Sequence, residues 1–224
     1  MKLILFGATG MVGQGALKAA LADAGVERVL AIVRSPLGET HAKLRELVHR
    51  DFHDYTAVAG ELAGYDACLF CLGVSAGGMS EAEYTAITYD VTIAAAKAVL
   101  AANPSARFLY VSGAGTDSTE KGRAMWARVK GRTENALLAM PFKSAHMLRP
   151  GAIQPLDGIV SKTPAYRTMY AVAGWLFPLA KAVAPRHITT TRELGAAMLT
   201  LARDGSAKAV LEAPDLVAIG RSKG

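Results

Sequence analysis

Three glycines near the N-terminus, Gly7, Gly10 and Gly13, are the first residues of this sequence whose spacing suggests chemistry. They follow the apolar segment 1–6 directly, and helical composition follows them, which predicts a strand, a tight turn and a helix. A Cβ in such a turn would hold the backbone N–H groups away from a phosphate, and the helix N-terminus presents unpaired donors to it. The pattern therefore predicts a dinucleotide site, with an ordinary β-to-α turn as the alternative. The residues of that site would be Gly7, Thr9, Gly10, Met11, Val12 and Gly13.

A second buried strand is predicted over 28–33, and Arg34 follows at its end. An acidic residue at this place hydrogen-bonds the adenosine ribose in NAD enzymes, whereas an arginine nearby meets the 2′-phosphate of NADP. No aspartate or glutamate stands beside Arg34, so the sequence favours NADP(H) as the cofactor. The alternative is an ordinary arginine in a surface loop.

Further strands are expected over 44–51, 65–72, 107–111 and 144–148, and helical segments alternate with them. Such alternation predicts an α/β fold of the Rossmann type, a doubly wound parallel sheet with helices on both faces. Ligands of these sheets bind beyond the carboxyl ends of the strands. The candidates to line the cofactor site there are Asp51 and Phe52 at the adenine, Leu72 and Gly73 at the end of the fourth strand, and Pro150 and Gly151 after the sixth.

Two stretches have the spacing of a helix capping box, in which two side chains satisfy each other's exposed backbone donors. They begin at Ser80 and at Thr190. After Ser80 we expect a long alanine-rich helix that reaches Ala102 and is kinked near Tyr89. A last strand is expected within 209–219.

The whole chain, 1–224, is expected to form a single domain, in which about 152–190 make a lid or substrate-side region. The segment 166–184 is strongly apolar, but Pro178 and Lys181 interrupt it. It is too short and too broken for a membrane span, which needs about 20 apolar residues. We expect a substrate lid or part of the core, with a subunit contact and a lipid-facing surface as alternatives.

The composition, 51% hydrophobic with a formal net charge of +6, permits an anionic partner. The basic residues are spread along the chain, and their densest cluster is more typical of a solvated helix face beside a phosphate-bearing cofactor than of a nucleic-acid surface. The expected partners are therefore a small-molecule substrate and a second copy of the chain or another protein, and no nucleic acid. That cluster consists of Lys121, Arg123, Arg128, Lys130 and Arg132.

Cys68 and Cys71 form a Cys-x-x-Cys, which suggests redox or zinc chemistry. They lie inside an expected buried strand, where positions three apart point to opposite faces, and no second ligand pair exists. We expect two reduced, packed thiols and no metal. Only four apolar residues lie between Lys2 and Gly7, too few for a signal peptide, so a cytoplasmic protein is expected.

With these residues in place, the chain resembles the short-chain dehydrogenase/reductase superfamily. The likeness is to its extended and atypical branch of epimerase-like and NmrA-like NAD(P)-binding proteins, and within it to the HIV Tat-interacting-protein group. It covers nearly the whole chain, and its most specific parts are the glycine loop, Ser112, Lys130 and the segment 149–151.

In that superfamily a serine polarises the substrate carbonyl, and a tyrosine four residues before a lysine exchanges the proton. The lysine holds the nicotinamide ribose and lowers the tyrosine pKa. The resemblance implies the first role for Ser112 and the last for Lys130. Trp126 stands where the tyrosine should be. An indole N–H can donate a hydrogen bond but cannot exchange a proton near neutral pH, so acid–base catalysis at this position is lost.

Two classes of function fit this pattern. The first is an NADP(H)-dependent oxidoreductase or epimerase-like enzyme on a small carbonyl or hydroxyl substrate, with Tyr89, Tyr166, His187 or a water as proton source. The second is a non-catalytic NADP(H) sensor, in which Lys130 only binds ribose and Ser112 only bonds neighbouring backbone. Fold analogy cannot choose between them, and the enzyme is preferred because both residues persist.

Overall fold

A computed structural model describes residues 1–160, 177 and 182–222 of the chain. Its centre is a parallel sheet of seven strands in the order β3-β2-β1-β4-β5-β6-β9. This order confirms the predicted doubly wound α/β sheet, because the chain runs outward from β1 to one edge and then returns to build the other. The strands are β1 (Lys2–Phe6), β2 (Arg28–Val33), β3 (Leu44–Val48), β4 (Ala67–Phe70), β5 (Arg107–Val111), β6 (Ser144–Arg149) and β9 (Val210–Glu212).

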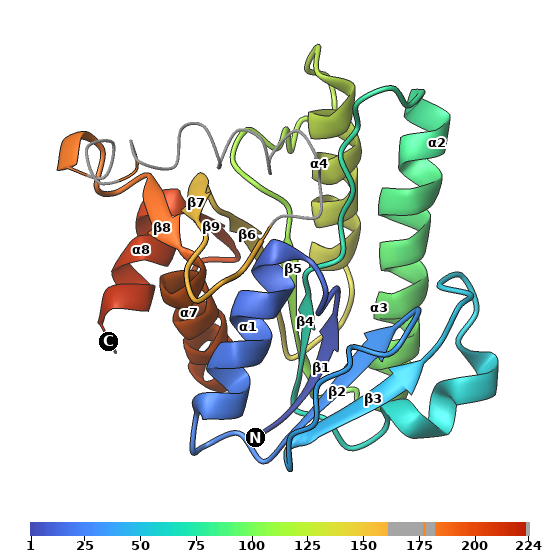
Figure 1. The fold of residues 1–224 in the computed structure, drawn as a ribbon. Coiled ribbons are helices and arrows are strands. Elements are labelled where there is room, and N and C mark those ends of the chain that lie inside the picture. Colours follow the sequence, from blue (N-terminus) through green and yellow to red (C-terminus); the bar gives the residue numbers. More distant parts are fainter. Residues whose placement is uncertain (161–176, 178–181, 223–224) are drawn as a thin grey trace.

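The central strands are apolar on both faces because helices cover both faces of the sheet. Leu3, Ile4, Leu5 and Phe6 of β1 are all fully buried. Leu3 and Leu5 pack beneath one helical layer, and Ile4 and Phe6 beneath the other (Figure 1). The first layer holds α1 (Met11–Ala22), α7 (Thr191–Asp204) and α8 (Ala213–Arg221), and the second holds η1 (Thr56–Leu62), α3 (Val91–Ala102) and α4 (Met125–Leu138).

The predicted kink in the long helix is a single π-helical turn, η2 (Ala86–Asp90), between α2 (Glu81–Thr85) and α3. The capping box at Ser80 is present, as is the one at Thr190 that begins α7. By length and composition the run Glu81–Ala102 also meets the description of a membrane span. In this fold its buried side chains pack in the core as those of an ordinary core helix do.

A small parallel pair that was not predicted, β7 (Ala152–Gln154) and β8 (Ile188–Thr190), lies beyond β6. It joins the two ends of the region expected to form a lid. Most of the apolar segment 166–184, for which a lid or core role was expected, lies outside the described residues.

Helices α1 and α7 approach so closely that only glycine fits at their contact. A Cβ on Gly195 would lie 2.8 Å from the carbonyl oxygen of Gly15 and 2.9 Å from the Cβ of Ala19. Both distances are far below van der Waals contact, and one neighbour is backbone that cannot move independently. The first helical layer therefore depends on this glycine.

We expect Gly195→Ala to lower the free energy of unfolding by about 1–3 kcal/mol, the usual cost of overpacking a core contact. Urea denaturation followed by circular dichroism measures it. Gly60→Ala is the matched control, because a Cβ at Gly60 meets nothing within 4 Å. An equal loss in both variants would contradict this account of the α1–α7 contact.

Candidate cofactor and catalytic site

The glycine loop is built as a cradle between β1 and α1. Gly7 adopts φ +78°, and its carbonyl accepts the N–H of Gly10 at 2.9 Å. A Cβ on Gly13 would lie 2.0 Å from the oxygen of Gly7, so the helix can begin here only with glycine at this position. No side chain caps the first turn of α1 at Gly10. This geometry fits a pyrophosphate, which would take the free N–H groups and the positive end of the helix dipole.

The other predicted cofactor residues reach the same edge of the sheet from its neighbouring strands. Arg34 follows β2 and is exposed, as is Asp51 after β3. Phe52 differs from expectation in its surroundings: only 8% of it is exposed, and its ring packs edge-on against Phe6, with 6.2 Å between ring centroids. Its ring is therefore mostly part of the hydrophobic core, and little of it is exposed at the edge of the sheet where the cofactor was expected.

A cavity of about 640 Å³ opens beyond the carboxyl ends of β4, β5 and β6. Its walls come from the segments after these strands and from helices α2 and α4. The structure thereby brings together residues that are scattered in the sequence. Among those predicted for the site, the cavity is lined by Ser112, Trp126, Lys130, Pro150 and Gly151.

The hydroxyl of Ser112 is turned to the protein interior. Its Oγ lies 2.5 Å from Glu134 Oε1 and 3.1 Å from the carbonyl oxygen of Leu148, and 3% of the residue is exposed. A hydroxyl carries one proton, and the carboxylate is the stronger acceptor. Ser112 therefore cannot donate to a substrate carbonyl while it donates to Glu134.

Glu134 is a fully buried carboxylate that the sequence did not single out. The guanidinium of Arg149 neutralises it through two nitrogens: Nη2 forms a short ion pair with Oε2, and Nε donates to Oε1 at 3.0 Å. Arg149 also donates to Ser118 Oγ at 2.6 Å and pairs with Glu212 at 3.0 Å. The pairing with Glu134 raises the pKa of Arg149. This network joins β5, α4, β6 and β9.

Lys130 lies one turn before Glu134 on α4 and faces the cavity. Its Nζ donates a short hydrogen bond to the main-chain oxygen of Ser112. Burial lowers the pKa of Lys130 to about 8, and the nearby charge of Glu134 opposes this shift only in part. The ammonium is thus a much stronger acid than that of a solvated lysine.

Trp126 lies one turn before Lys130 and lines the same cavity. Its indole packs against the segment after β5: the Cη2 atom lies 3.2 Å from the place where a Cβ of Gly115 would be. The side chain thus gives the lysine a broad apolar neighbour where the superfamily has a phenol.

A family model described as NAD(P)H-binding matches residues 7–149, which run from the glycine loop to the end of β6. The chain belongs to the NAD(P)H-binding family. The prediction of an NAD(P)-binding protein is thereby confirmed, and its Rossmann fold is that of solved short-chain dehydrogenase/reductase structures.

Two fungal proteins illustrate the relatives to which this chain is similar. Leucinostatins biosynthesis cluster protein T of Purpureocillium lilacinum is 30% identical over 80% of this chain and 71% of its own length. Protein fmp52-2, mitochondrial, of Aspergillus terreus is 27% identical over 98% of this chain and 96% of its own length.

Solved structures match the fold. A short-chain dehydrogenase/reductase family oxidoreductase of Burkholderia thailandensis superposes with a TM-score of 0.68 at 19% identity, over 97% of this chain and 92% of its own. A superfamily member of Agrobacterium tumefaciens with bound NAD gives 0.65 at 16% identity, over 97% and 81%.

The names of several relatives correct one expectation. The FMP52 proteins of several fungi are named mitochondrial, which contradicts the cytoplasmic location predicted for this chain. That prediction rested on the short apolar stretch before Gly7, which does not identify a compartment.

Two of the proton sources named from the sequence, Tyr89 and His187, are not among the residues that line the cavity. Tyr89 lines a different groove, between α3 and η1, and the guanidinium of Arg132 lies 4.2 Å from its ring centroid. His187 is exposed beside β8, and Tyr166 lies outside the described residues. Tyr84 of α2, which the sequence analysis passed over, lines the cavity and is 2% exposed. Nothing in its local sequence separates it from a core aromatic residue.

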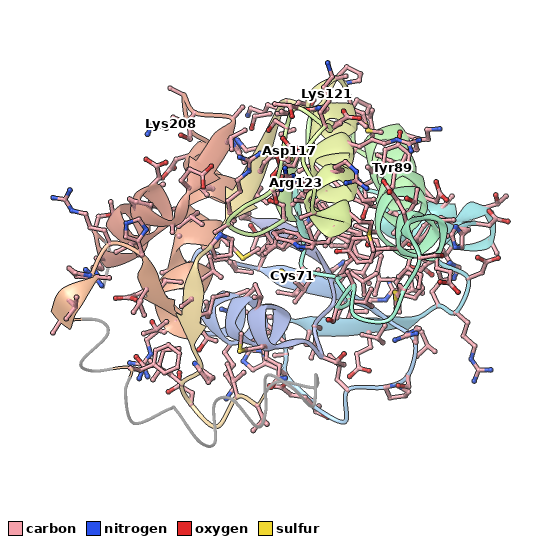
Figure 2. All side chains as sticks on the ribbon, turned by 90° about the horizontal axis from the view of Figure 1, so that it is seen from above. Cys71, Tyr89, Asp117, Lys121, Arg123 and Lys208 are labelled. Carbon is pink, nitrogen blue, oxygen red and sulfur yellow. The ribbon has the colours of Figure 1, made fainter. Side chains whose placement is uncertain are left out.

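The two cysteines and the five residues of the basic cluster lie in different surroundings. Cys68 and Cys71 are free, and burial raises the pKa of Cys71 to about 12. Figure 2 shows Cys71 near the centre of the molecule and Lys121 at its rim. Arg128 pairs with Glu81 at 2.5 Å, while Lys130 faces the cavity, so the basic cluster is divided among different surroundings.

We expect Arg149→Met to lower the free energy of unfolding by about 3–5 kcal/mol, because it leaves Glu134 buried and uncompensated. The double variant Glu134→Gln with Arg149→Met should recover part of that loss, since no buried charge is left. Chemical denaturation of the single and double variants measures the coupling.

The control is Arg192→Met, which breaks the ion pair with Asp157, whose side chains are 70% and 39% exposed. Its expected cost is about 0–1 kcal/mol. A loss in Arg149→Met no larger than in this control would show that the buried pair is unimportant.

Proposed function

We propose that this protein is an NADP(H)-dependent oxidoreductase or epimerase-like enzyme that acts on a small carbonyl or hydroxyl compound. The observation that carries the proposal is the cavity of about 640 Å³, which has a lysine ammonium in its wall and lies at the same edge of the sheet as the glycine cradle. Such a cavity, beyond the carboxyl ends of the strands, is where a substrate would meet the nicotinamide end of the cofactor.

Different residues along this edge of the sheet would bind different parts of the cofactor. The loop from Gly7 to Gly13 would hold the pyrophosphate, and Arg34 would meet a 2′-phosphate. Lys130 would hold the nicotinamide ribose, and Pro150 and Gly151 would close the cavity wall beyond β6. When bound, a reduced nicotinamide supplies a hydride to an electrophilic carbon.

Ser112 acts in this proposal through its backbone. Its carbonyl oxygen fixes the Lys130 ammonium, and its hydroxyl holds the end of β5 to Glu134. Trp126 excludes water from the ammonium and exchanges no proton.

A screen of aldehydes, ketones and keto-sugars for NADPH oxidation by the purified protein tests the activity, with NADPH binding followed separately by fluorescence. Carbonyl-dependent oxidation supports the enzyme. Tight NADPH binding without turnover of any compound would favour the sensor, for which the replacement of the tyrosine by Trp126 also speaks.

We expect the wild type to prefer NADPH to NADH, because a charge-assisted contact from Arg34 to the 2′-phosphate is worth about 1.5–3 kcal/mol, or tenfold to hundredfold in affinity. Arg34→Ala should remove the preference. Arg28→Ala is the control, because it changes the net charge equally at the other end of β2. Equal wild-type affinities for the two cofactors would eliminate the role of Arg34.

A further inference from the structure

The cavity lacks the phenol that the superfamily uses as its acid, so reduction of a carbonyl there needs another proton source. Among the described residues that line it, the side chains that titrate are those of Lys130 and Tyr84. We propose that Lys130 is itself the proton donor, and that its ammonium protonates the substrate oxygen directly. This inference rests on the proposed function and adds a chemical role to a residue otherwise assigned to binding.

The position of the ammonium suits this role. An ammonium carries three N–H donors, and the carbonyl oxygen of Ser112 accepts one of them. That bond fixes Nζ at the end of β5, and the lysine side chain forms part of the cavity wall, so its other donors are available to a ligand. Trp126, four residues earlier on α4, lies on the same helix face and can make no competing proton transfer.

The surroundings of Lys130 lower its pKa. Burial beside the indole of Trp126 disfavours the charged form and brings the pKa of Lys130 to about 8. The opposite charge of Glu134 favours the ammonium and raises the pKa. Arg149 is paired with that carboxylate and offsets part of its field.

The other titratable groups around Lys130 in the described part of the chain come from three neighbouring elements. They are Tyr84 of α2 in the cavity wall, Tyr110 of β5 near Glu134, and Arg149 of β6. Burial raises the pKa of Tyr110 well above its ordinary value, so this phenol stays neutral. An acid with a pKa of about 8 is mostly protonated at neutral pH and yet can transfer its proton, which is the balance that general acid catalysis needs.

A bound reduced nicotinamide would supply a hydride to the carbonyl carbon and would itself be oxidised. The carbonyl oxygen gains the proton from Lys130 Nζ, so the carbonyl compound becomes an alcohol. The N–H bond of the ammonium breaks and leaves a neutral amine, which takes a proton from water before the next turnover. Oxidation of an alcohol runs the same transfer in reverse, with the neutral amine as the base.

The first test compares Lys130→Arg with the wild type. A guanidinium keeps the positive charge and can still bond the Ser112 carbonyl, but it does not deprotonate. We expect NADPH affinity to change little, while kcat for carbonyl reduction falls about 10²-fold to 10⁴-fold. Wild-type turnover should decline as the pH rises through about 8, and Trp126→Ala, which admits water to the ammonium, should move that decline to higher pH.

The second test requires no turnover. Acetylation of the free protein with acetic anhydride across a pH series, read by peptide mass spectrometry, reports the neutral fraction of each lysine. Lys130 should react with a midpoint near pH 8, and the exposed Lys97 of α3 serves for comparison. A midpoint for Lys130 equal to that of Lys97 would overturn the proposal.

The remaining outcomes separate the two hypotheses. An active wild type whose turnover survives in Lys130→Arg overturns the donor role alone. The donor role also falls if Tyr84→Phe, with its fold intact by circular dichroism, abolishes turnover while Lys130→Arg keeps both turnover and its alkaline decline, since the phenol is then the acid. A wild type that binds NADPH but reduces no carbonyl overturns the proposed function and the donor role with it.

Discussion

The neutralisation of one buried carboxylate is the constraint on which this site depends. Glu134 has no access to water, and an isolated charge in the interior is costly, so the guanidinium of Arg149 must reach it from β6. Ser112 completes the arrangement by donating its hydroxyl from the end of β5. Because that bond holds the backbone of Ser112, its carbonyl oxygen stands where the ammonium of Lys130 can bind it. An ion pair outside the cavity thus sets the geometry inside it.

The order of the strands decides how the parts of the site are spaced. The glycine cradle follows β1, whereas the cavity lies over β4, β5 and β6. Neighbouring strands are about 4.8 Å apart, so about 15 Å separates β1 from β6. A ligand that uses both places must therefore extend along the sheet edge. The contact between Gly7 and the backbone of Cys71, where a Cβ would come within 2.7 Å, keeps the first two strands of this path together.

The fold could be predicted from the sequence because its signals are local. Buried parallel strands appear as apolar runs, closely spaced glycines mark the turn into α1, and capping boxes mark the start of two helices. The parts of the site that escaped prediction depend on partners distant in the chain. Glu134, four residues after Lys130, looks like a member of an exposed helix pair, and only Arg149 shows that it is buried. Tyr84 and the β7–β8 pair are likewise defined by tertiary contacts.

The π-helical turn Ala86–Asp90 has a geometric consequence for the cavity wall. Such a turn accommodates one residue more than an α-helix does, and each residue of an α-helix advances the chain by about 100° around the axis. Helix α2 is therefore rotated about its axis by about that angle, compared with a regular α-helix that continued α3 without the π-helical turn. The rotational offset helps determine which side of the helix carries Tyr84. The number of residues in the π-helical turn therefore affects which side chain of α2 lines the cavity, in addition to the identity of that side chain.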